Sequence, residues 1–376
     1  MRPRTRRCSS DVDLQYPSCH AHAVSHDRID RHRFAQGETI VDASFFSEGM
    51  ELAKLPYFEI RNGNRLALAD DTVGPIIDVH THFALSYATP WKVDIRKEYE
   101  ATEHYLPMQG SPLDMEVYLN KNFTPVTLKR MKKDLTLKSL TRSGMRRTHT
   151  IPNLTREMDE LGIARSVTLP IDYPILSTNG VDTLEAVRGN DRFIAFGTVH
   201  PYASGVEAKL DRQVALGARG VKVHPAVQLL SPSNHRAMKL YRLCAARRLP
   251  VLFHCGPVGI EPKMGRKRSQ VVLYEQAIAE NPDVVFILGH SGALQMEGAL
   301  EYAKRYANVY MDLSCQALSN VRKILDEADP DRVLYGTDWP FYHQAIALAK
   351  VLVATEGAPE LRRKVLHDNA ARLFSA

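Results

Sequence analysis

The sequence predicts an α/β protein that folds as an eight-stranded (β/α)8 barrel. Short apolar runs alternate with helical patterns from Pro75 onward, and this alternation produces a parallel sheet. Eight such runs are present, the number that closes a barrel, and the span 75–355 is close to the length of about 250 residues typical of these barrels. An open doubly wound sheet is the alternative, but no Gly-x-Gly-x-x-Gly turn follows the first run.

The elements follow one another in a regular order. The expected strands are Ile76–His80, Ala164–Leu169, Phe193–Val199, Gly220–His224, Pro250–His254, Val284–His290, Val309–Leu313 and Val333–Asp338. The expected helices run from Asn153 or Thr155 to Leu161, then over 181–189, Ser204–Leu216, Asn234–Arg247, 269–280, 296–306, 318–327 and His343–Ala354, with two last segments at 359–366 and 368–374. Asn153 or Thr155 can cap the first helix, and Gly162 can end it.

Two segments precede the barrel. Residues 1 to about 36 are polar and rich in Arg and His, without a hydrophobic period, and we expect 1–49 to be a disordered extension. A start at Met50 is an alternative that would make those residues a misassigned extension. Within 50–74, two apolar segments flank Asn62-Gly63, which predicts a β-hairpin.

Residues from about 83 to 150 interrupt the alternation and are expected to form an insert after the first strand. The insert contains Trp91, several prolines and, between Lys121 and Arg147, nine Lys or Arg residues against the single acid Asp134. This basic cluster could bind an anionic substrate or partner, or it could be a solvated helix face. The chain carries a net charge of +6, and the remainder is slightly acidic, so we do not expect nucleic-acid binding.

The composition is that of a soluble globular protein, with 44% hydrophobic and 24% charged residues. The five cysteines are widely spaced and form no Cys-x-x-Cys motif, which argues against a disulfide framework and a cysteine zinc site. We therefore expect a cytoplasmic protein with a small-molecule substrate, with a homodimer as an open alternative. No signal peptide pattern is present, and no apolar run approaches the ~18 residues of a membrane span.

The strand ends carry the candidate chemistry. Barrel active sites lie at the carboxyl ends of the strands, and five strands here end in side chains that bind metals or protons: His80 and His82, Lys222 and His224, His254, His290, and Asp338. On a strand, residues two apart share a face, so Asp78, His80 and His82 should point the same way, and the two imidazoles can share one metal. A buried Lys222 would need a partner or a role.

Together these motifs resemble the amidohydrolase superfamily, in particular the metal-dependent hydrolases and decarboxylases typified by aminocarboxymuconate semialdehyde decarboxylase. The resemblance covers roughly 75–376. The motifs that carry it are Asp78-Val79-His80-Thr81-His82, Gly220-Val221-Lys222-Val223-His224-Pro225, Phe253-His254-Cys255-Gly256, Gly289-His290-Ser291-Gly292, Gly336-Thr337-Asp338-Trp339-Pro340 and Asn369-Ala370-Ala371-Arg372-Leu373.

The resemblance implies a role for each strand-end residue. His80, His82, His254 and Asp338 would hold one divalent metal, with zinc expected and manganese as the alternative. His290 would be the catalytic histidine that faces water or substrate, and Asp338 would also relay a proton. Lys222 would either bridge two metals as a carbamate, as in binuclear relatives, or serve the substrate or the structure, and His224 shares these alternatives.

Other residues are weaker candidates. Arg266, with Lys263, Lys267 and Arg268, follows the fifth strand and could bind a substrate carboxylate or form a solvated loop. Trp91 could line the pocket or belong to the core. Asp312 should face the barrel beside the site, whereas Cys255 should point outward and pack.

Three functions are compatible with these residues. The first is a metal-dependent hydrolase that uses an activated water on an amide, lactone, ester or C–C bond of a small carboxylated molecule. The second is a lyase, either a decarboxylase or a hydratase, that uses the same site. The third is a non-catalytic metal- or ligand-binding protein, which the presence of His290 beside a complete ligand set disfavours.

Overall fold

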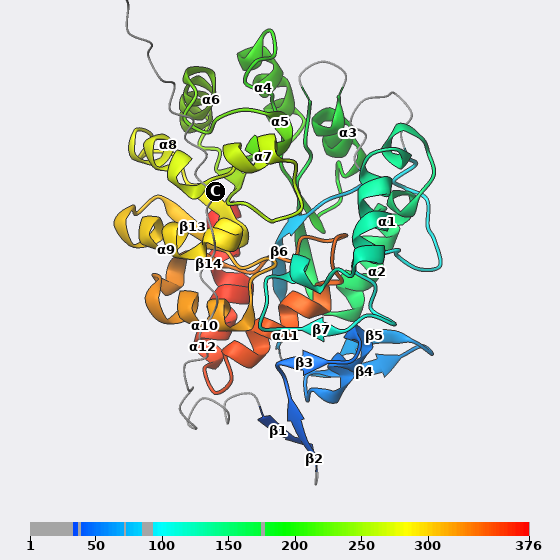
Figure 1. Ribbon diagram of the computed structural model, residues 1–376. Helices are drawn as coiled ribbons and strands as arrows, with labels where there is room; N and C mark the ends of the chain where they lie inside the picture. The colour runs from blue at the N-terminus through cyan, green and yellow to red at the C-terminus, as the bar shows by residue number, and fades with distance from the viewer. Residues whose placement is uncertain (1–32, 37–38, 71–72, 85–92, 174–176, 376) are drawn as a thin grey trace, which may run out of the picture.

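The structure is a computed structural model that describes residues 33–36, 39–70, 73–84, 93–173 and 177–375. Its centre consists of parallel strands surrounded by helices (Figure 1). The strands are β6 (Ile76–Thr81), β8 (Ile163–Thr168), β9 (Phe193–Ala195), β10 (Val221–Val223), β11 (Val251–His254), β12 (Phe286–Gly289), β13 (Val309–Asp312) and β14 (Val333–Leu334).

These strands close into a barrel. The order β6-β8-β9 forms one parallel sheet and β10-β11-β12-β13-β14 another. Parallel bridges between Gly197 and Val221 and between Thr81 and Trp339 join the two sheets at both seams. At the second seam, the Val79 N–H donates to the Tyr335 carbonyl at 2.9 Å. The predicted (β/α)8 barrel is therefore confirmed.

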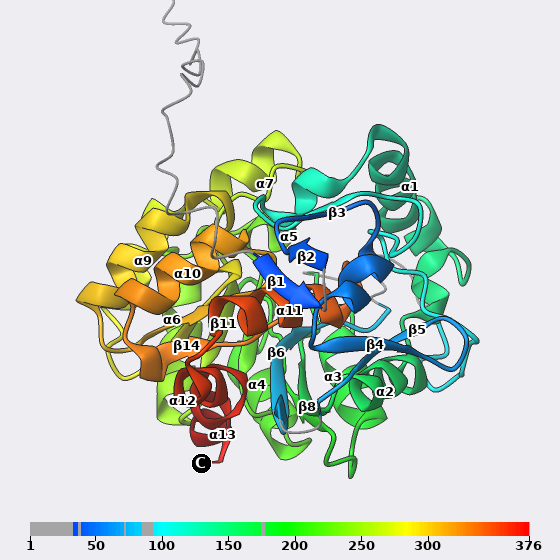
Figure 2. The same ribbon diagram turned by 90° about the horizontal axis from the view of Figure 1, so that it is seen from below.

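The alternation of side chains along the strands separates two apolar layers. Residues such as Ile77, Leu252 and Leu334 pack inside the barrel, whereas Val221 and Phe253 belong to the outer layer beneath the helices. Phe374, near the C-terminus, packs against Phe196 of the inner layer with ring centroids 5.8 Å apart. The last helix thus covers the end of the barrel opposite the strand ends that carry the site, as the view from below shows (Figure 2).

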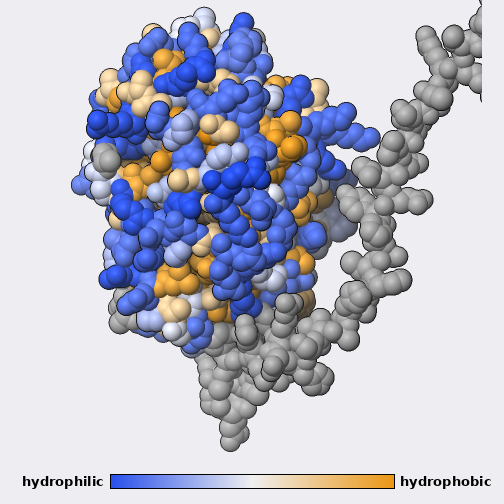
Figure 3. All heavy atoms as spheres, turned by 90° about the vertical axis from the view of Figure 1, so that its left-hand side faces the viewer, coloured by the Kyte–Doolittle hydropathy of each residue, from blue (hydrophilic) through white to orange (hydrophobic). Residues whose placement is uncertain are grey.

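The helices between the strands lie close to the expected positions. They are α2 (Ile151–Glu160), α3 (Asn179–Ala186), α4 (Val206–Ala215), α6 (His235–Ala246), α9 (Met296–Arg305), α10 (Leu318–Glu327) and α11 (Gln344–Ala354). Short helices add α5 (Pro225–Gln228), α7 (Lys263–Arg268), α8 (Glu275–Ala279), α12 (Pro359–Arg363) and α13 (Asn369–Phe374), with a π-turn at Lys364–Asp368. The face that carries α8–α10 is largely hydrophilic (Figure 3), as expected for helices whose apolar sides face the strands.

Some expected boundaries differ. The helix α2 begins after Thr150, and the Asn153 side chain, expected as a cap, instead accepts a hydrogen bond from the Tyr99 N–H at 2.9 Å. The helix expected over 269–280 is divided into a 3₁₀ turn at Val271–Leu273 and α8.

The N-terminal segment also differs from its expected boundary. Residues 1–32 and 37–38 lie outside the described residues, but β1 (Arg33–Gln36) pairs with β2 (Thr39–Asp42), and β3 (Phe45–Phe46) pairs with β7 (Leu113–Asp114) of the insert. Ala43 and Phe46 are buried. The part of 1–49 nearest the barrel therefore belongs to the fold, because Phe46 adds apolar surface to its core.

The expected hairpin is present as β4 (Phe58–Arg61) and β5 (Arg65–Leu68), which pair antiparallel. Three residues, Asn62, Gly63 and Asn64, join the strands, since Arg61 pairs with Arg65. Asn62 and Gly63 have positive φ, at 47° and 83°, a conformation that Asn and Gly adopt more readily than other residues.

The insert folds over the barrel around α1 (Pro125–Leu135) and 3₁₀ turns at Leu119–Asn122, Lys138–Leu140 and Met145–Thr148. A further 3₁₀ turn, Gly49–Lys54, precedes the hairpin. Asp134, the single acid of the basic cluster, is buried and accepts hydrogen bonds from the Met145 N–H at 2.8 Å and the Tyr105 hydroxyl at 3.0 Å. Of the helices in the described part of the chain, none combines the length and apolar character needed to cross a bilayer.

Candidate active site

The two histidines of the His-x-His motif converge on Asp338. His82 Nε2 lies 3.4 Å from Asp338 Oδ1, and His80 Nε2 lies 3.8 Å from the same oxygen. His80 comes from β6, His82 follows it, and Asp338 follows β14, so the group spans the seam where the first and last strands of the barrel meet.

One expectation about this motif is wrong. Asp78 does not share a face with His80, because its carboxylate accepts hydrogen bonds from the Thr337 hydroxyl at 2.6 Å and the Gln344 amide at 2.7 Å, at the start of α11. The register of β6 against β8 shifts between Asp78 and Thr81, which breaks the strict alternation of a strand. Asp78 therefore holds β6 to the segment after β14.

In both His80 and His82, the second ring nitrogen, Nδ1, forms a hydrogen bond on the side of the ring away from Asp338. His80 Nδ1 lies 2.6 Å from Asp312 Oδ2, and His82 Nδ1 lies 2.7 Å from the Leu169 carbonyl oxygen. Both partners accept hydrogen bonds, which assigns the proton to Nδ1 in each ring and leaves the Nε2 lone pair facing Asp338. Metal-binding histidines are usually oriented in this way. Asp312 is fully buried and lies beside the site, where the sequence placed it.

His254 and His290 form the neighbouring side of the site. His290 Nε2 lies 3.2 Å from His254 Nδ1, and His290 Nδ1 lies 2.8 Å from Ser314 Oγ. The Ser314 hydroxyl donates to Asp312 at 2.8 Å. This chain assigns the His290 proton to Nδ1 and its lone pair to Nε2.

Lys222 and His224 complete the rim. Lys222 Nζ lies 3.2 Å from His80 Nε2, so its side chain points into the barrel as expected. His224 is the N-cap of α5, where its side chain accepts the Val227 N–H at 3.3 Å. Its ring stacks on His254 with centroids 3.9 Å apart.

Burial dominates the electrostatics of these groups. It lowers the pKa values of His80, His254 and His290 well below the ordinary value of histidine, with further lowering by neighbouring positive groups. Burial also lowers the pKa of Lys222 to about 7, although Asp338 and Asp312 act in the opposite direction. The imidazoles are therefore neutral, the state in which histidine binds metals or accepts protons.

The backbone is strained where the site residues lie. His290, Cys315 and Asp338 have positive φ values of 56°, 65° and 64°, a conformation that is uncommon for residues other than glycine. Gly336 lies so close that a Cβ there would overlap Asp312 Oδ1. The strand expected over Val333–Asp338 consequently ends at Leu334.

The donor atoms fit a divalent metal. Among the described residues, His80, His290 and Asp338 offer ligand atoms within 4.8 Å of one another, and the Nε2 atom of His82 faces the same carboxylate. Imidazole nitrogens with a carboxylate are the donor set typical of catalytic zinc and similar ions. His254 lies one hydrogen bond away, through His290.

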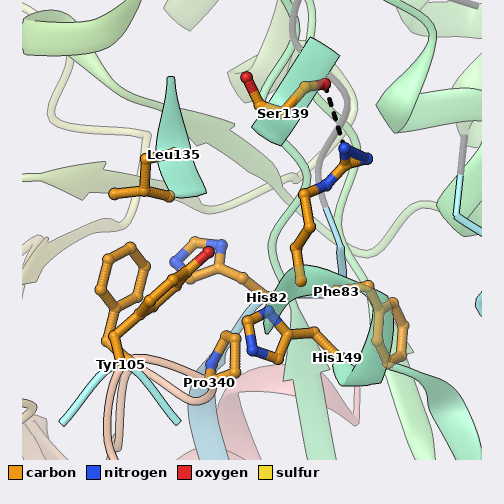
Figure 4. A pocket seen from close by; sticks show the side chains of 9 residues that line it. His82, Phe83, Tyr105, Leu135, Ser139, His149 and Pro340 are labelled. Atoms are coloured by element: carbon orange, nitrogen blue, oxygen red, sulfur yellow. Dashed lines mark hydrogen bonds between the residues drawn. The ribbon is translucent and has the colours of Figure 1, made fainter. Parts of the chain in front are cut away.

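A small pocket adjoins this group. Figure 4 shows His82, Phe83, Tyr105, Leu135, Ser139, His149 and Pro340 around it, and Arg146 and Phe341 complete its wall. Its volume is about 20 Å³, room for about one water molecule. Most of these residues belong to the insert, so the insert covers the site.

The sequence did not indicate Tyr105, Arg146 and His149 as site residues. They lie in irregular segments, where no periodicity assigns a face, and Arg146 is one of nine similar basic residues. Ser314 was missed because its role depends on its spatial contact with His290. The one feature of the sequence that could have indicated Tyr105, Arg146 and His149 is that the insert begins directly after His82, so its residues lie near the site.

The remaining candidates lie elsewhere. Trp91 is outside the described residues. Arg266 lies on the exposed side of α7, with Nε 3.9 Å from Glu261 and 48% of its side chain exposed. Lys263 and Lys267 are also exposed, and Arg268 is half-buried. Cys255 is buried in the outer apolar layer, and burial raises the pKa of its thiol.

Comparison with protein families gives one match. The family described as Amidohydrolase matches residues 175–376, more than half of the chain. The chain belongs to this family. The predicted superfamily is thereby confirmed. A comparison of this amidohydrolase with curated proteins gives no significant match.

Solved structures show the same fold at low sequence identity. An uncharacterized TIM-barrel protein from Bordetella bronchiseptica is 18% identical with a TM-score of 0.57, covering 80% of this chain and 99% of that chain. For 5-carboxyvanillate decarboxylase from Novosphingobium aromaticivorans, complexed with manganese, the identity is 15%, the TM-score 0.53 and the coverage 82% and 98%. A probable 2-pyrone-4,6-dicarboxylic acid hydrolase from Acinetobacter baumannii is 15% identical with a TM-score of 0.51, and the match covers 81% of this chain and 100% of that chain.

This amidohydrolase contains a second buried polar group beside the first. His104, Glu157 and His343 also offer ligand-type atoms within 4.8 Å of one another. His343 Nδ1 accepts the Ala345 N–H at 3.2 Å, so Nε2 carries the proton, 3.8 Å from Glu157. Glu157 also accepts the Trp339 indole N–H at 3.1 Å. These bonds favour a hydrogen-bonded network that supports the segment after Asp338 over a metal site.

Proposed function

We propose that the protein is a metal-dependent hydrolase that acts on a small carboxylated substrate. The observation that carries this proposal is the convergence of His80 Nε2 and His82 Nε2 on Asp338, while acceptors behind each ring hold the proton on Nδ1. Lys222 Nζ can donate to the His80 lone pair at 3.2 Å, but His82 Nε2 still faces the Asp338 carboxylate at 3.4 Å, and an electrophile bound between them would offset the repulsion of a lone pair and a carboxylate.

His80, His82, His254 and Asp338 are the residues that would hold the metal, with zinc expected and manganese as the alternative. A divalent cation bound there supplies Lewis-acid polarisation of an oxygen of water or substrate. His290 lies nearer to His80 and Asp338 than His254 does in this structure; the assignment of His254 to metal binding and of His290 to catalysis follows the family resemblance of the strand-end motifs.

His290 would be the general base. It is neutral, and its Nδ1–H is held by Ser314. Its Nε2 lone pair faces His254 Nδ1 at 3.2 Å and would accept a proton from an attacking water in exchange for that hydrogen bond. The water oxygen adds to the carbonyl carbon, the bond to the leaving group breaks, and His290 returns the proton to the leaving atom. Asp338 can accept a hydrogen bond from the same water.

Decarboxylation is the second candidate. The pocket wall is largely apolar, with Phe83, Leu135 and Phe341, an environment that favours loss of charge from a carboxylate. One of the similar folds is a decarboxylase and another a probable hydrolase, so both reactions occur on this architecture. Here His290 would take up a proton from water and deliver it to the carbon that loses CO2.

The deciding experiment is a screen of lactones, amides and aromatic carboxylates with protein reconstituted with Zn²⁺ or Mn²⁺. Acid release and CO2 release are read in parallel, and metal content is measured for each preparation. Hydrolysis predicts acid without CO2. A His290→Asn variant that keeps its metal is the control. CO2 release would select the lyase, and metal-loaded protein without turnover on the whole panel would reject both enzymatic proposals.

A further inference from the structure

Trp339 links the candidate metal site to the helix α2. It follows Asp338 directly, and its carbonyl accepts the His82 N–H at 2.7 Å. A parallel bridge also pairs this residue with Thr81, and its side chain is fully buried. A change in the position of Trp339 would therefore shift the backbone of Asp338 and His82, two of the residues that we propose as metal ligands.

One carboxylate fixes the orientation of the Trp339 ring. The indole N–H is the only hydrogen-bonding group of a tryptophan side chain, and it donates to Glu157 Oε2 at 3.1 Å. Glu157 lies on α2, outside the barrel, and is 4% exposed. A buried donor without an acceptor is unfavourable, so this bond restricts the ring to one orientation.

The insert holds Glu157 in place. His104 Nε2 lies 3.1 Å from Glu157 Oε1, and His104 Nδ1 lies 3.3 Å from the Pro340 carbonyl oxygen. The insert also bonds to the same segment through its backbone, because the Leu106 N–H donates to the Phe341 carbonyl at 3.0 Å. The segment after β14 is thus held by β6 and, independently, by Glu157 together with the insert.

The backbone of Asp338 depends on such contacts. Its φ of 64° is uncommon for residues other than glycine, and strained conformations persist only where the surrounding structure imposes them. The Asp338 N–H donates to the His80 carbonyl at 2.8 Å, and its carbonyl accepts the Phe341 N–H at 2.9 Å. Binding groups must be held within about 0.5 Å of their productive geometry, so a small shift of this segment would weaken metal binding.

We propose that Glu157 is a positioning residue for Asp338. Its carboxylate holds the indole of Trp339, and the indole in turn holds the Asp338 side chain where it can bind the metal. This inference rests on the proposed function, in which Asp338 is a metal ligand. It goes beyond support of the fold, because it predicts an effect on metal affinity in protein that is fully folded.

The test measures zinc affinity by competition with a chelator, at a temperature where every variant is folded, and records each melting temperature. Trp339→Phe removes the donor, Glu157→Leu removes the acceptor, and the double variant removes both. Glu157→Gln is the conservative variant, because its amide oxygen can still accept the indole N–H. Glu160→Gln is the matched control, since Glu160 lies on the same helix and is 13% exposed, but pairs with Arg65 at 3.2 Å.

We expect Trp339→Phe and Glu157→Leu each to weaken zinc binding by about 2- to 10-fold, the range for one hydrogen bond. The double variant should lose little more than either single variant, because both changes remove the same interaction. Glu157→Gln should melt at a lower temperature yet bind zinc like wild type, and Glu160→Gln should also bind like wild type. If Glu157→Leu does not fold, the comparison of Trp339→Phe with the two glutamine variants decides.

Three results would overturn the inference: unchanged zinc affinity in Trp339→Phe, additive losses in the double variant, or the same loss in Glu160→Gln. The two proposals fail separately. Zinc affinity that does not depend on Glu157, in protein that turns over a substrate, rejects the positioning role alone. Zinc affinity that depends on Glu157, without turnover on any substrate, rejects the enzymatic function alone.

Discussion

Asp312 links both sides of the site, since its carboxylate accepts the His80 ring proton at 2.6 Å and the His290 backbone N–H at 3.1 Å. Replacing it with Asn removes the charge that favours the Nδ1–H form of His80. We expect Asp312→Asn to lower zinc affinity by about 10- to 100-fold, the usual effect of losing such a partner. Competition with a chelator of known affinity measures this, with Asp326→Asn on the exposed side of α10 as the control. Equal affinities in both variants would contradict the assigned role.

Glu157 gives a prediction about pH. Burial would raise the pKa of this carboxyl, but its interactions with His104 and then with His343 outweigh that effect and lower the pKa from 4.5 to about 2. The ionised form is therefore more favourable in the folded state, so its stabilisation is complete above pH 4.5 and is lost as the pH falls toward 2. Glu157→Gln should destabilise the protein at pH 7 by on the order of 3 kcal/mol.

The difference in melting temperature between Glu157→Gln and wild type should consequently shrink as the pH falls below 4.5. Melting curves at pH 7, 5 and 4 test this, with the exposed Glu360→Gln as the control. A difference that stays constant over this range would show that Glu157 acts through packing rather than charge.

At the scale of elements, β3 gives a prediction that distinguishes two chain starts. Phe46 is 2% exposed and Phe45 is 56% exposed, and the Met115 N–H donates to the Ser44 carbonyl at 2.8 Å. A protein that starts at Met50 loses these contacts, and we expect it to be less stable by roughly 3 kcal/mol, the range for deleting a buried phenyl ring. A protein that starts at Arg33 should match the full chain, because the removed segment has no hydrophobic period.

The two neighbouring phenylalanines supply the control for this truncation. Phe46→Ala in the full chain should reproduce most of the loss in melting temperature, whereas Phe45→Ala should have little effect. If the protein that starts at Met50 has the same melting temperature as the full chain, β3 does not contribute to stability, and the extension ends at residue 49 as the sequence predicted.

The elements that the sequence predicted well are those with strong periodicity. Strands such as β11 and β12 are buried on both faces, so their apolar runs are unmistakable, and their ends lie within two residues of the expected positions. The expected hairpin followed from Asn62-Gly63. The insert offered no such period, and Asp78 was assigned to the wrong face because a register shift in β6 leaves no mark in the sequence.

At the scale of the whole molecule, the strand-end histidines were predictable because a parallel barrel brings all carboxyl ends to one rim. Arg146, Tyr105 and Ser314 were not, since their positions depend on how a long insert folds back and on contacts between distant segments. The same geometry explains why the candidate metal group lies at a seam: His80 belongs to the first strand of the barrel, Asp338 follows the last strand, and the bridge between Thr81 and Trp339 connects the two segments.

A metal at this seam should stabilise the whole barrel. Its ligands join segments about 260 residues apart in sequence, and a ligand present at 100 times its dissociation constant contributes about 2.7 kcal/mol. We expect chelation to lower the melting temperature and Zn²⁺ or Mn²⁺ to restore it. A His82→Ala variant, which lacks one of the proposed ligands, should show a smaller response. Identical melting curves for wild type with chelator and with metal would argue against a metal at this position.

The number of metals decides between one-metal and two-metal chemistry, and Lys222 is the residue on which the answer depends. Burial brings the pKa of its amine to about 7, so a neutral amine that could form a bridging carbamate is accessible, yet Nζ lies 3.2 Å from His80 Nε2 as a hydrogen-bonding partner. The four side chains that we propose as ligands would form a complete set with an open position, so we expect one metal per chain.

Elemental analysis of wild-type and Lys222→Met protein tests this count, because methionine keeps the length of the side chain and cannot form a carbamate. We expect one metal per chain in both proteins, with activity reduced in the variant if Lys222 contacts the substrate. Lys350→Met, on α11, controls for the removal of a buried lysine away from the site. Two metals in wild type that fall to one in Lys222→Met alone would replace the single-metal site with a binuclear one and favour hydrolysis over decarboxylation.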